Sequence, residues 1–291
     1  MCIRDRIKTA RKWASDTKGE GEHPFVTLVN SFHGRTLTTV TATGQDTFHK
    51  FFGPFTPGFR YVPASDLAAL ERQLDAEDCS AVLVEIVQGE GGVRALDADY
   101  LKAVEALCHE KNVLFCVDEV QTGNGRTGTW FAYEQFGLSP DLVSTAKGLG
   151  NGLPIGATLM GSKTAEVLTP GTHGSTFGGN PVACAGALSV LEQIDDAFLE
   201  AVKQKGAWLT AELEKIPGVK DVSGLGLMLG FSVEGCKSAD IKAKALDNGL
   251  VVLTAKDRVR LLPPLAITEE ELSDGLLRLA AAIREVQEAA H

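Results

Sequence analysis

The sequence lacks long apolar runs and basic clusters, and each absence argues against a class of protein. No apolar run approaches the roughly 18 residues of a membrane-spanning helix, and Met1 to Lys12 carries charges but no signal-peptide core. With a formal net charge of −10 and no basic cluster, nucleic acid and anionic membranes are disfavoured as partners. Nothing in the sequence directs export, so we expect a cytoplasmic protein.

The cysteines also lack a pattern, because none lies in the CxxC spacing of metal and redox sites. Several fall in apolar periodic segments, where a free thiol packs like a small apolar side chain. This predicts buried free thiols in a reducing compartment, and no metal site. The cysteines are Cys2, Cys79, Cys108, Cys116, Cys184 and Cys236.

The length of 291 residues exceeds one typical core, so we expect a large domain with a smaller companion. Apolar strands alternate with amphipathic helices up to about residue 190, which predicts an α/β fold with a mainly parallel sheet. Beyond it, amphipathic helices separate short strands. We therefore predict a large domain at residues 1–189 and a small α+β domain at residues 190–291.

Local signals predict individual elements. Ser65 is expected to cap a helix whose apolar face carries Leu67, Leu70 and Leu74. A buried strand is expected from Ala81 to Val87. Near the C-terminus, Thr268 and Glu271 form a capping box before a last amphipathic helix.

The stretch around which the chain is organised lies between residues 113 and 156. Five apolar residues, Val113 to Val117, predict a strand buried on both faces, with Asp118 at its end. A second apolar run leads to Lys147, so an acid and a lysine are expected at neighbouring strand ends. Each alone is more simply a capping aspartate or a surface lysine. Together they match what pyridoxal 5'-phosphate requires, which is an amine for the Schiff base and an acid for the ring nitrogen.

Gly123, Gly125 and Gly128 spell a competing motif, the GxGxxG of dinucleotide-binding proteins. The adjacent Asp118 and Glu119 would crowd a pyrophosphate with negative charge. The acid expected about 20 residues further on is not clearly present. We therefore disfavour a nicotinamide site.

Three motifs occur in order: DEVQTGNGRTG from Asp118, STAKGLGNGLPIG from Ser144 and HGSTFGGNP from His173. Together they closely resemble the class III aminotransferases, from about Ile7 to the C-terminus. The resemblance implies the type I fold of pyridoxal-phosphate transferases, with a mainly parallel seven-stranded sheet in the large domain. It also implies a homodimer acting on small amino acids and 2-oxo acids. Residues 1–6 agree with no family pattern and are excluded from the fold prediction.

The resemblance assigns cofactor-binding roles to five residues. Lys147 would form the Schiff base and shuttle a proton, and Asp118 would keep the ring nitrogen protonated. Phe32 would stack on the ring, and Gln121 would contact its phenolic oxygen. Thr176 would hold the phosphate of the cofactor in the partner subunit.

The resemblance also assigns substrate-binding roles. Arg35 would bind a substrate carboxylate, since its planar fork donates two parallel hydrogen bonds. Arg260 would take the α-carboxylate of glutamate and 2-oxoglutarate, and Glu90 would pair with it. Ser175 is placed with them, although a helix cap is its simpler interpretation. For His33, packing in the turn and a place beside the cofactor are left open.

The favoured reaction is ping-pong transamination between N2-acetylornithine and 2-oxoglutarate. Ornithine, 4-aminobutyrate and diaminobutyrate remain alternative donors within the class. A different alternative is a folded but inactive fragment, since the long N-terminal segment and the phosphate-binding loop of the resembled family are not in this sequence. The large domain is accordingly expected to be N-terminally incomplete.

Overall fold

The computed structural model describes residues 2–289 of the chain, which divides into two compact units. The first unit comprises Met1–Ile86, Leu96–Asn124 and Phe131–Ile194. The second comprises Val87–Ala95, Gly125–Trp130 and Asp195–His291. Two short excursions into the second unit thus interrupt the first. They were not foreseen, and the domain boundary at residues 189 and 190 stays a prediction.

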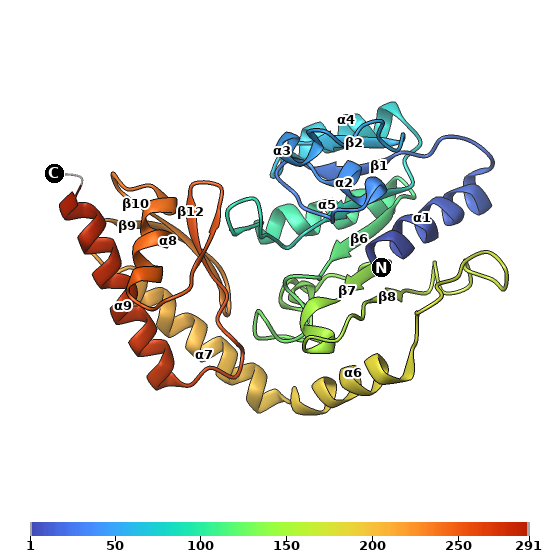
Figure 1. The fold of residues 1–291 in the computed structure, drawn as a ribbon. Helices are drawn as coiled ribbons and strands as arrows, with labels where there is room; N and C mark the ends of the chain where they lie inside the picture. Colours follow the sequence, from blue (N-terminus) through green and yellow to red (C-terminus); the bar gives the residue numbers. More distant parts are fainter. Residues whose placement is uncertain (1, 290–291) are drawn as a thin grey trace. The chain divides into compact units, whose positions relative to one another are not determined.

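The first unit is built on a mainly parallel sheet (Figure 1). Within residues 2–289 it has six strands in the order β2-β1-β3-β6-β7-β8, with only the edge strand β8 antiparallel. The mainly parallel α/β sheet is confirmed, but the count of seven strands is not. The strands are β1 (Phe25–Leu28), β2 (Phe59–Val62), β3 (Ala81–Val84), β6 (Leu114–Asp118), β7 (Leu142–Thr145) and β8 (Ala157–Met160).

Helices cover this sheet and frame its edges. Helix α1 packs on β7 and β8, α5 on β6, and α4 on β2 and α5, while α6 contacts the turn η2. The elements are α1 (Cys2–Lys18), α2 (Leu37–Ala42), α3 (Asp46–His49), α4 (Leu67–Ala76), α5 (Ala98–Glu110), α6 (Pro181–Gln193) and the 3-10 turns η1 (Ala132–Phe136) and η2 (Lys147–Gly150).

The start of α1 corrects one prediction. The helix begins at Cys2, inside the segment that was excluded from the fold prediction, and the side chain of Arg6 is fully buried in the first unit. Ile7, Ala10 and Trp13 then pack on alternate apolar residues of the strands, where period-2 side chains face the helix. Excluding residues 1–6 from the fold was therefore wrong for the described part of this segment.

Three further local predictions need correction. Helix α4 is capped by Asp66, whose carboxylate accepts the N–H of Ala69, whereas Ser65 has a left-handed φ of 65°. Leu70 and Leu74 are buried as expected, but Leu67 is exposed. The strand expected up to Val87 is β3 only to Val84, because the chain then turns into the second unit.

The second unit contains a four-stranded antiparallel sheet in the order β11-β12-β10-β9, and a hairpin of β4 and β5. Leucines of α9, including Leu272 and Leu279, pack on it, and Thr268 and Glu271 form the predicted capping box. The elements are β4 (Val87–Gln88), β5 (Arg94–Ala95), α7 (Asp196–Leu213), β9 (Val219–Leu225), β10 (Met228–Val233), α8 (Ser238–Asp247), β11 (Leu253–Ala255), β12 (Arg258–Leu261) and α9 (Glu269–Ala289).

Residues 125–130, which we call the strap, are tied into the second unit by Arg126. Its guanidinium donates to the carbonyls of Leu227 at 3.0 Å and Pro263 at 2.6 Å. Leu227 N–H returns a bond of 3.0 Å to the Arg126 carbonyl. Burial lowers the pKa of Arg126 to about 10, which leaves it a cation whose partners are backbone dipoles.

The thiols behave as predicted where they are described. Cys79, Cys108 and Cys116 are buried and free, whereas Cys184 and Cys236 are partly buried. Burial raises the pKa of Cys116 to about 12, so this thiol stays protonated and inert. The side chain of Cys2 lies outside the described residues. Among residues 2–289, no helix is both long and apolar enough to cross a bilayer.

Candidate active site

Two adjacent strand ends of the first unit bring the central candidates together. Strand β6 ends at Asp118, which lies opposite Ser144 of the parallel strand β7. Lys147 follows that strand by two residues. Because the carboxyl ends of parallel strands are where open α/β sheets bind ligands, this edge is the natural site.

Lys147 is exposed and has a left-handed φ of 49°, a strained backbone for a residue with a long side chain. Asn124 holds the chain just before it. Its amide donates to Thr145 Oγ1 at 2.9 Å and to the Ala146 carbonyl at 3.1 Å. The backbone that carries Lys147 is therefore fixed by a residue on the turn after β6.

Asp118 is buried and held by three donors. His33 Nδ1 lies 2.8 Å and Arg6 Nη2 lies 3.2 Å from Oδ2, while the N–H of Val120 donates to Oδ1 at 3.2 Å. Burial alone would raise the pKa of Asp118, but the charge of Arg6 and the bond from His33 outweigh it and lower the pKa to about 2. Asp118 is thus a carboxylate at neutral pH.

His33 lies beside the carboxylate of Asp118. It is fully buried, and burial lowers its pKa more than the neighbouring Asp118 raises it. A neutral imidazole that donates from Nδ1 leaves Nε2 as an acceptor. Nε2 is buried and has no hydrogen-bond partner among the described residues.

The motif after β1 is locked by its backbone. Phe32 N–H donates to Glu85 Oε2 and His33 N–H to Thr43 Oγ1, both at 2.9 Å. Gly34 has a φ of 128°, and a Cβ there would lie 2.6 Å from Thr39 Oγ1, so this turn requires glycine. The turn presents Phe32 half-buried and Arg35 exposed.

Glu119 is a second buried acid next to Asp118. It accepts bonds from the Thr122 hydroxyl and, at 2.9 Å, from the N–H of Tyr133. Burial raises the pKa of Glu119 to about 7 despite these bonds. Glu119 therefore ties the turn after β6 to η1 while remaining partly protonated.

We predict that Glu119 makes the protein less stable as the pH rises. Between its usual pKa of 4.5 and a folded value of about 7, the folded protein binds this proton more tightly than the unfolded chain. The free energy of unfolding should therefore fall by about 1 to 3 kcal/mol from pH 4.5 to 8 through this group. Urea unfolding of Glu119→Gln should show a shallower decline. Glu110→Gln, at an exposed position of α5, is the control, and equal slopes for all three proteins would contradict the prediction.

The remaining cofactor candidates of the first unit lie on turns. Gln121 is half-buried after β6, and Thr176 is exposed in the loop before α6. Ser175 is half-buried, and its carbonyl accepts the N–H of Gly178. Asn180 and Pro181 form the predicted N-cap and first turn of α6. The roles of Gln121, Thr176 and Ser175 stay predictions.

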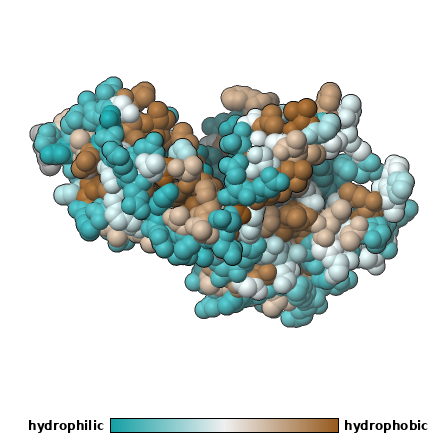
Figure 2. Space-filling model, turned by 90° about the horizontal axis from the view of Figure 1, so that it is seen from below, coloured by the Kyte–Doolittle hydropathy of each residue, from teal (hydrophilic) through white to brown (hydrophobic). Residues whose placement is uncertain are grey.

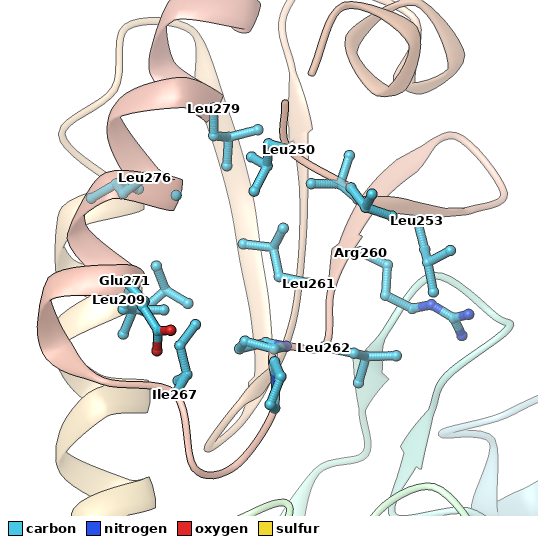
Figure 3. Close-up of a pocket in the computed structure, with 16 residues that line it drawn as sticks. Leu209, Leu250, Leu253, Arg260, Leu261, Leu262, Ile267, Glu271, Leu276 and Leu279 are labelled. Atoms are coloured by element: carbon cyan, nitrogen blue, oxygen red, sulfur yellow. The ribbon is translucent and has the colours of Figure 1, made fainter. Parts of the chain in front are cut away.

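Glu90 and Arg260, both in the second unit, are paired. Arg260 Nη1 lies 2.8 Å from Glu90 Oε1, and the Arg260 side chain is 9% exposed against 27% for Glu90. Arg260 also borders an apolar cavity of about 280 Å³. In Figure 3 the guanidinium of Arg260 points away from the side chains of Leu250, Leu261 and Leu279. The two residues that the resemblance joins thus lie together.

The dinucleotide interpretation of Gly123, Gly125 and Gly128 finds no support here. That motif requires a helix directly after the strand, whereas residues 119–131 form turns. Within residues 2–289, no cluster of three or more His, Cys, Asp or Glu side chains is arranged to hold a metal ion.

A family model described as "Aminotransferase class-III" matches residues 3–283. The chain belongs to the class III aminotransferases. Acetylornithine aminotransferase of Haemophilus ducreyi is 50% identical to this aminotransferase over 281 residues, which cover 96% of the chain and 72% of that protein. The Bacillus subtilis protein of the same name is 46% identical over 282 residues, 95% of this chain and 71% of its own length.

Solved structures give the same result. An ornithine aminotransferase from Toxoplasma gondii superimposes on this aminotransferase with a TM-score of 0.90 and 36% identity, covering 99% of this chain and 71% of that one. N-acetylornithine aminotransferase from Stenotrophomonas maltophilia gives 0.84 and 35%, covering 99% and 73%. The α/β aminotransferase fold is therefore confirmed.

Class III aminotransferases use pyridoxal phosphate, and the residues of the first unit fit this cofactor. A carboxylate has about four acceptor sites, and the bonds to Asp118 occupy three, which leaves one for a ring N–H. The buried Nε2 of His33 and Oγ of Ser144 have no partner among the described residues, so a polar group could satisfy them. The fixed cation of Arg6 opposes binding, because it already neutralises Asp118.

Sequence reasoning missed several residues that shape this site. Arg6 was excluded, the role of His33 was left open, and Asn124 and Glu85 were not considered. Asn124 lies inside the motif after β6, and Glu85 is an acid in an otherwise apolar strand segment. Both features can be seen in the sequence and could have marked these residues as candidates. The contact between Arg6 and Asp118 joins residues 112 positions apart, so no local sequence pattern predicts it.

Proposed function

We propose that this aminotransferase transfers the amino group of N2-acetylornithine to 2-oxoglutarate, with pyridoxal phosphate as cofactor. One observation carries the proposal. A buried carboxylate with a pKa of about 2, Asp118, and an exposed amine, Lys147, follow neighbouring parallel strands of one unit. That pair is what a transaminase requires of its protein.

The residues of the first unit divide the work. When bound, pyridoxal phosphate supplies an electron sink for the carbanion of the donor. The amine of Lys147 holds the cofactor and moves a proton at the donor carbon. Asp118 would keep the ring nitrogen charged, and the hydrogen bond from His33 would help to keep Asp118 ionised. Phe32 and Gln121 are proposed to contact the ring face and the phenolic oxygen, and Thr176 is proposed to contact the phosphate of the cofactor in the partner subunit.

Recognition of two different donors needs an adjustable cation. N2-acetylornithine reacts through its terminal amine and glutamate through its α-amine, so their carboxylates lie at different distances from the reacting carbon. We assign the carboxylate of the first to Arg35. Arg260 binds the α-carboxylate of glutamate after the Arg260 side chain has moved away from Glu90. When N2-acetylornithine is bound, Arg260 pairs with Glu90 again. Ser175 is placed beside the substrate by the resemblance alone.

We expect Glu90→Ala to shift the preference of the enzyme towards glutamate. Without its partner, Arg260 is permanently available. Half-reaction rates with glutamate should therefore rise relative to those with N2-acetylornithine. Because Arg260 is buried, the change corresponds to up to a few kcal/mol of activation free energy. Both half-reactions are measured by single-turnover absorbance. The exposed Glu234→Ala of the same unit is the control. An unchanged ratio would remove Glu90 and Arg260 from substrate choice.

The choice of donor is tested by a panel. With 2-oxoglutarate as acceptor, kcat/KM is compared for N2-acetylornithine, ornithine, 4-aminobutyrate and diaminobutyrate. We expect N2-acetylornithine to be preferred. The likeness to the Toxoplasma ornithine aminotransferase supports ornithine as the second candidate. A higher kcat/KM for ornithine would replace the proposed substrate and leave the reaction type intact.

We propose that the enzyme is a cytoplasmic homodimer. Its buried free thiols suit a reducing compartment. Around α6, Phe177, Val182 and Leu188 are 79%, 69% and 59% exposed, which is costly for apolar side chains. Figure 2 shows one face of the molecule with apolar side chains, in brown, among hydrophilic ones. Thr176 lies next to Phe177, so this loop would bring Thr176 to the partner's cofactor.

A further inference from the structure

We propose that Phe48 is a positioning residue that fixes the guanidinium of Arg35 for the substrate carboxylate. The inference rests on the proposed function, because it adds to the role assigned to Arg35. Phe48 belongs to none of the motifs that identify the family. We infer its role from the contacts that it makes in the first unit.

The three side chains form a compact cluster. Arg35 Cζ lies 5.0 Å from the ring centroid of Phe48 and 5.5 Å from that of Phe32. The two rings meet edge to face, with centroids 5.1 Å apart at 66°. These distances lie within the roughly 6 Å over which a cation is attracted to an aromatic face. Since Phe32 is assigned to the cofactor ring, Phe48 is the aromatic whose position serves Arg35.

Phe48 is itself held from both sides. It lies on α3, a four-residue helix too short to be stable alone. The amide of Gln45 donates to the carbonyls of Asn30 and Ser31, at 3.2 and 3.0 Å, which ties the start of α3 to the start of the turn that carries Phe32. At its end, His49 Nε2 lies 2.9 Å from the Val40 carbonyl of α2. The ring of Phe48 is therefore preorganised.

An aromatic contact suits an arginine that must stay available to a ligand. A carboxylate partner would hold Arg35 more strongly, but it would occupy the N–H edge and neutralise the charge. No carboxylate within residues 5–289 forms an ion pair with Arg35. A ring attracts the guanidinium through its face and leaves the N–H fork for a bidentate bond. Ordering the exposed side chain beforehand lowers the entropy cost of binding.

The test compares two amine donors that differ in one group. N-acetyl-1,4-diaminobutane is N2-acetylornithine without its carboxylate, so it cannot use Arg35. Phe48→Leu keeps apolar volume but removes the ring. We expect its KM for N2-acetylornithine to rise about twofold to tenfold, with little change in kcat. For the decarboxylated donor kcat/KM should not change. Phe48→Tyr, which keeps the ring face, should behave like the wild type.

A structural role would give a different pattern. If Phe48 only packs the turn, Phe48→Leu lowers kcat/KM for both donors alike, which overturns the proposal. An unchanged KM for N2-acetylornithine overturns it as well. Arg35→Gln separates this failure from failure of the proposed function. If Arg35→Gln leaves that KM unchanged, the role of Arg35 itself is wrong.

A spectroscopic measurement tests the contact without turnover. In protein labelled at arginine, the Arg35 side-chain protons should be shifted upfield by the rings, and the shift should shrink in Phe48→Leu and persist in Phe48→Tyr. Arg72→Gln, at an exposed position of α4, assigns a reference resonance that should not move. Identical Arg35 resonances in the wild type and Phe48→Leu would show that the ring does not hold the guanidinium.

Discussion

Replacing Lys147 with alanine should lower turnover by roughly five to six orders of magnitude, the loss seen when a nucleophile is removed. The amine would both hold the cofactor and move the proton at the donor carbon, so one substitution removes two functions. Glutamate formation from 2-oxoglutarate measures the loss. Borohydride reduction followed by mass spectrometry should label Lys147 with a pyridoxyl group in the wild type and leave the variant unlabelled.

Two controls separate the amine from other effects. Lys163→Ala removes a half-exposed lysine of the same unit, which pairs with Asp141 at 3.2 Å, and should keep its turnover. Lys147→Arg keeps the positive charge and should be as inactive as Lys147→Ala, since a guanidinium does not form the linkage. Activity above about 1% in Lys147→Ala would end the assignment, because losses on removing a covalent catalyst are far larger.

The second large effect is expected for Asp118→Asn, with kcat falling by about a hundredfold to a thousandfold, as for loss of one preorganised electrostatic contact. An amide cannot hold a ring nitrogen in its charged form. The exchange also strands the buried cation of Arg6, and breaking such a pair costs about 3 to 5 kcal/mol of stability. The double variant Arg6→Leu/Asp118→Asn removes the stranded charge and should recover stability but not turnover.

Asp141→Asn is the matched control for Asp118→Asn. Asp141 is also a buried aspartate, and it accepts the N–H of Phe115 at 2.9 Å before β7, away from the strand ends that carry the site. Its loss should affect stability and leave kcat almost unchanged. Comparable falls in kcat for both variants would mean that Asp118 acts only through the fold. Near-normal turnover by Asp118→Asn would mean that the end of β6 is not the cofactor site.

The elements around Asp118 and Lys147 could be predicted because their signals are local. A short apolar run ending in an acid specifies a buried parallel strand, and β6 ends at Asp118 as expected. Asn180 before Pro181 and the pair of Thr268 and Glu271 specify helix starts by capping chemistry within four residues. In each case the stabilising partner lies within a few positions of the signal.

What could not be predicted depends on distant partners. Ser65 and Asp66 are equally good caps, and the left-handed φ of Ser65 decides between them. Phe48 looks like any phenylalanine of an irregular segment until α3 is folded back onto the turn that carries Arg35. Arg6 was excluded because residues 1–6 match no family pattern, yet it contacts Asp118, the residue proposed to hold the ring nitrogen. The number of strands in the sheet likewise depends on pairing that no single segment encodes.

The strap has a consequence for dividing the protein into parts. A fragment that starts at residue 195 contains Arg260, Leu227 and Pro263, but neither Glu90 nor the strap that bonds to those carbonyls. No single cut in the chain separates the second unit from the first. Two segments of the second unit, Val87–Ala95 and Gly125–Trp130, lie in sequence between segments of the first unit. During synthesis these two segments are made before residues 195–291, with which they form the second unit. The pair of Glu90 and Arg260, which we propose selects the substrate, therefore forms only after β12 has been synthesised, 170 residues after Glu90.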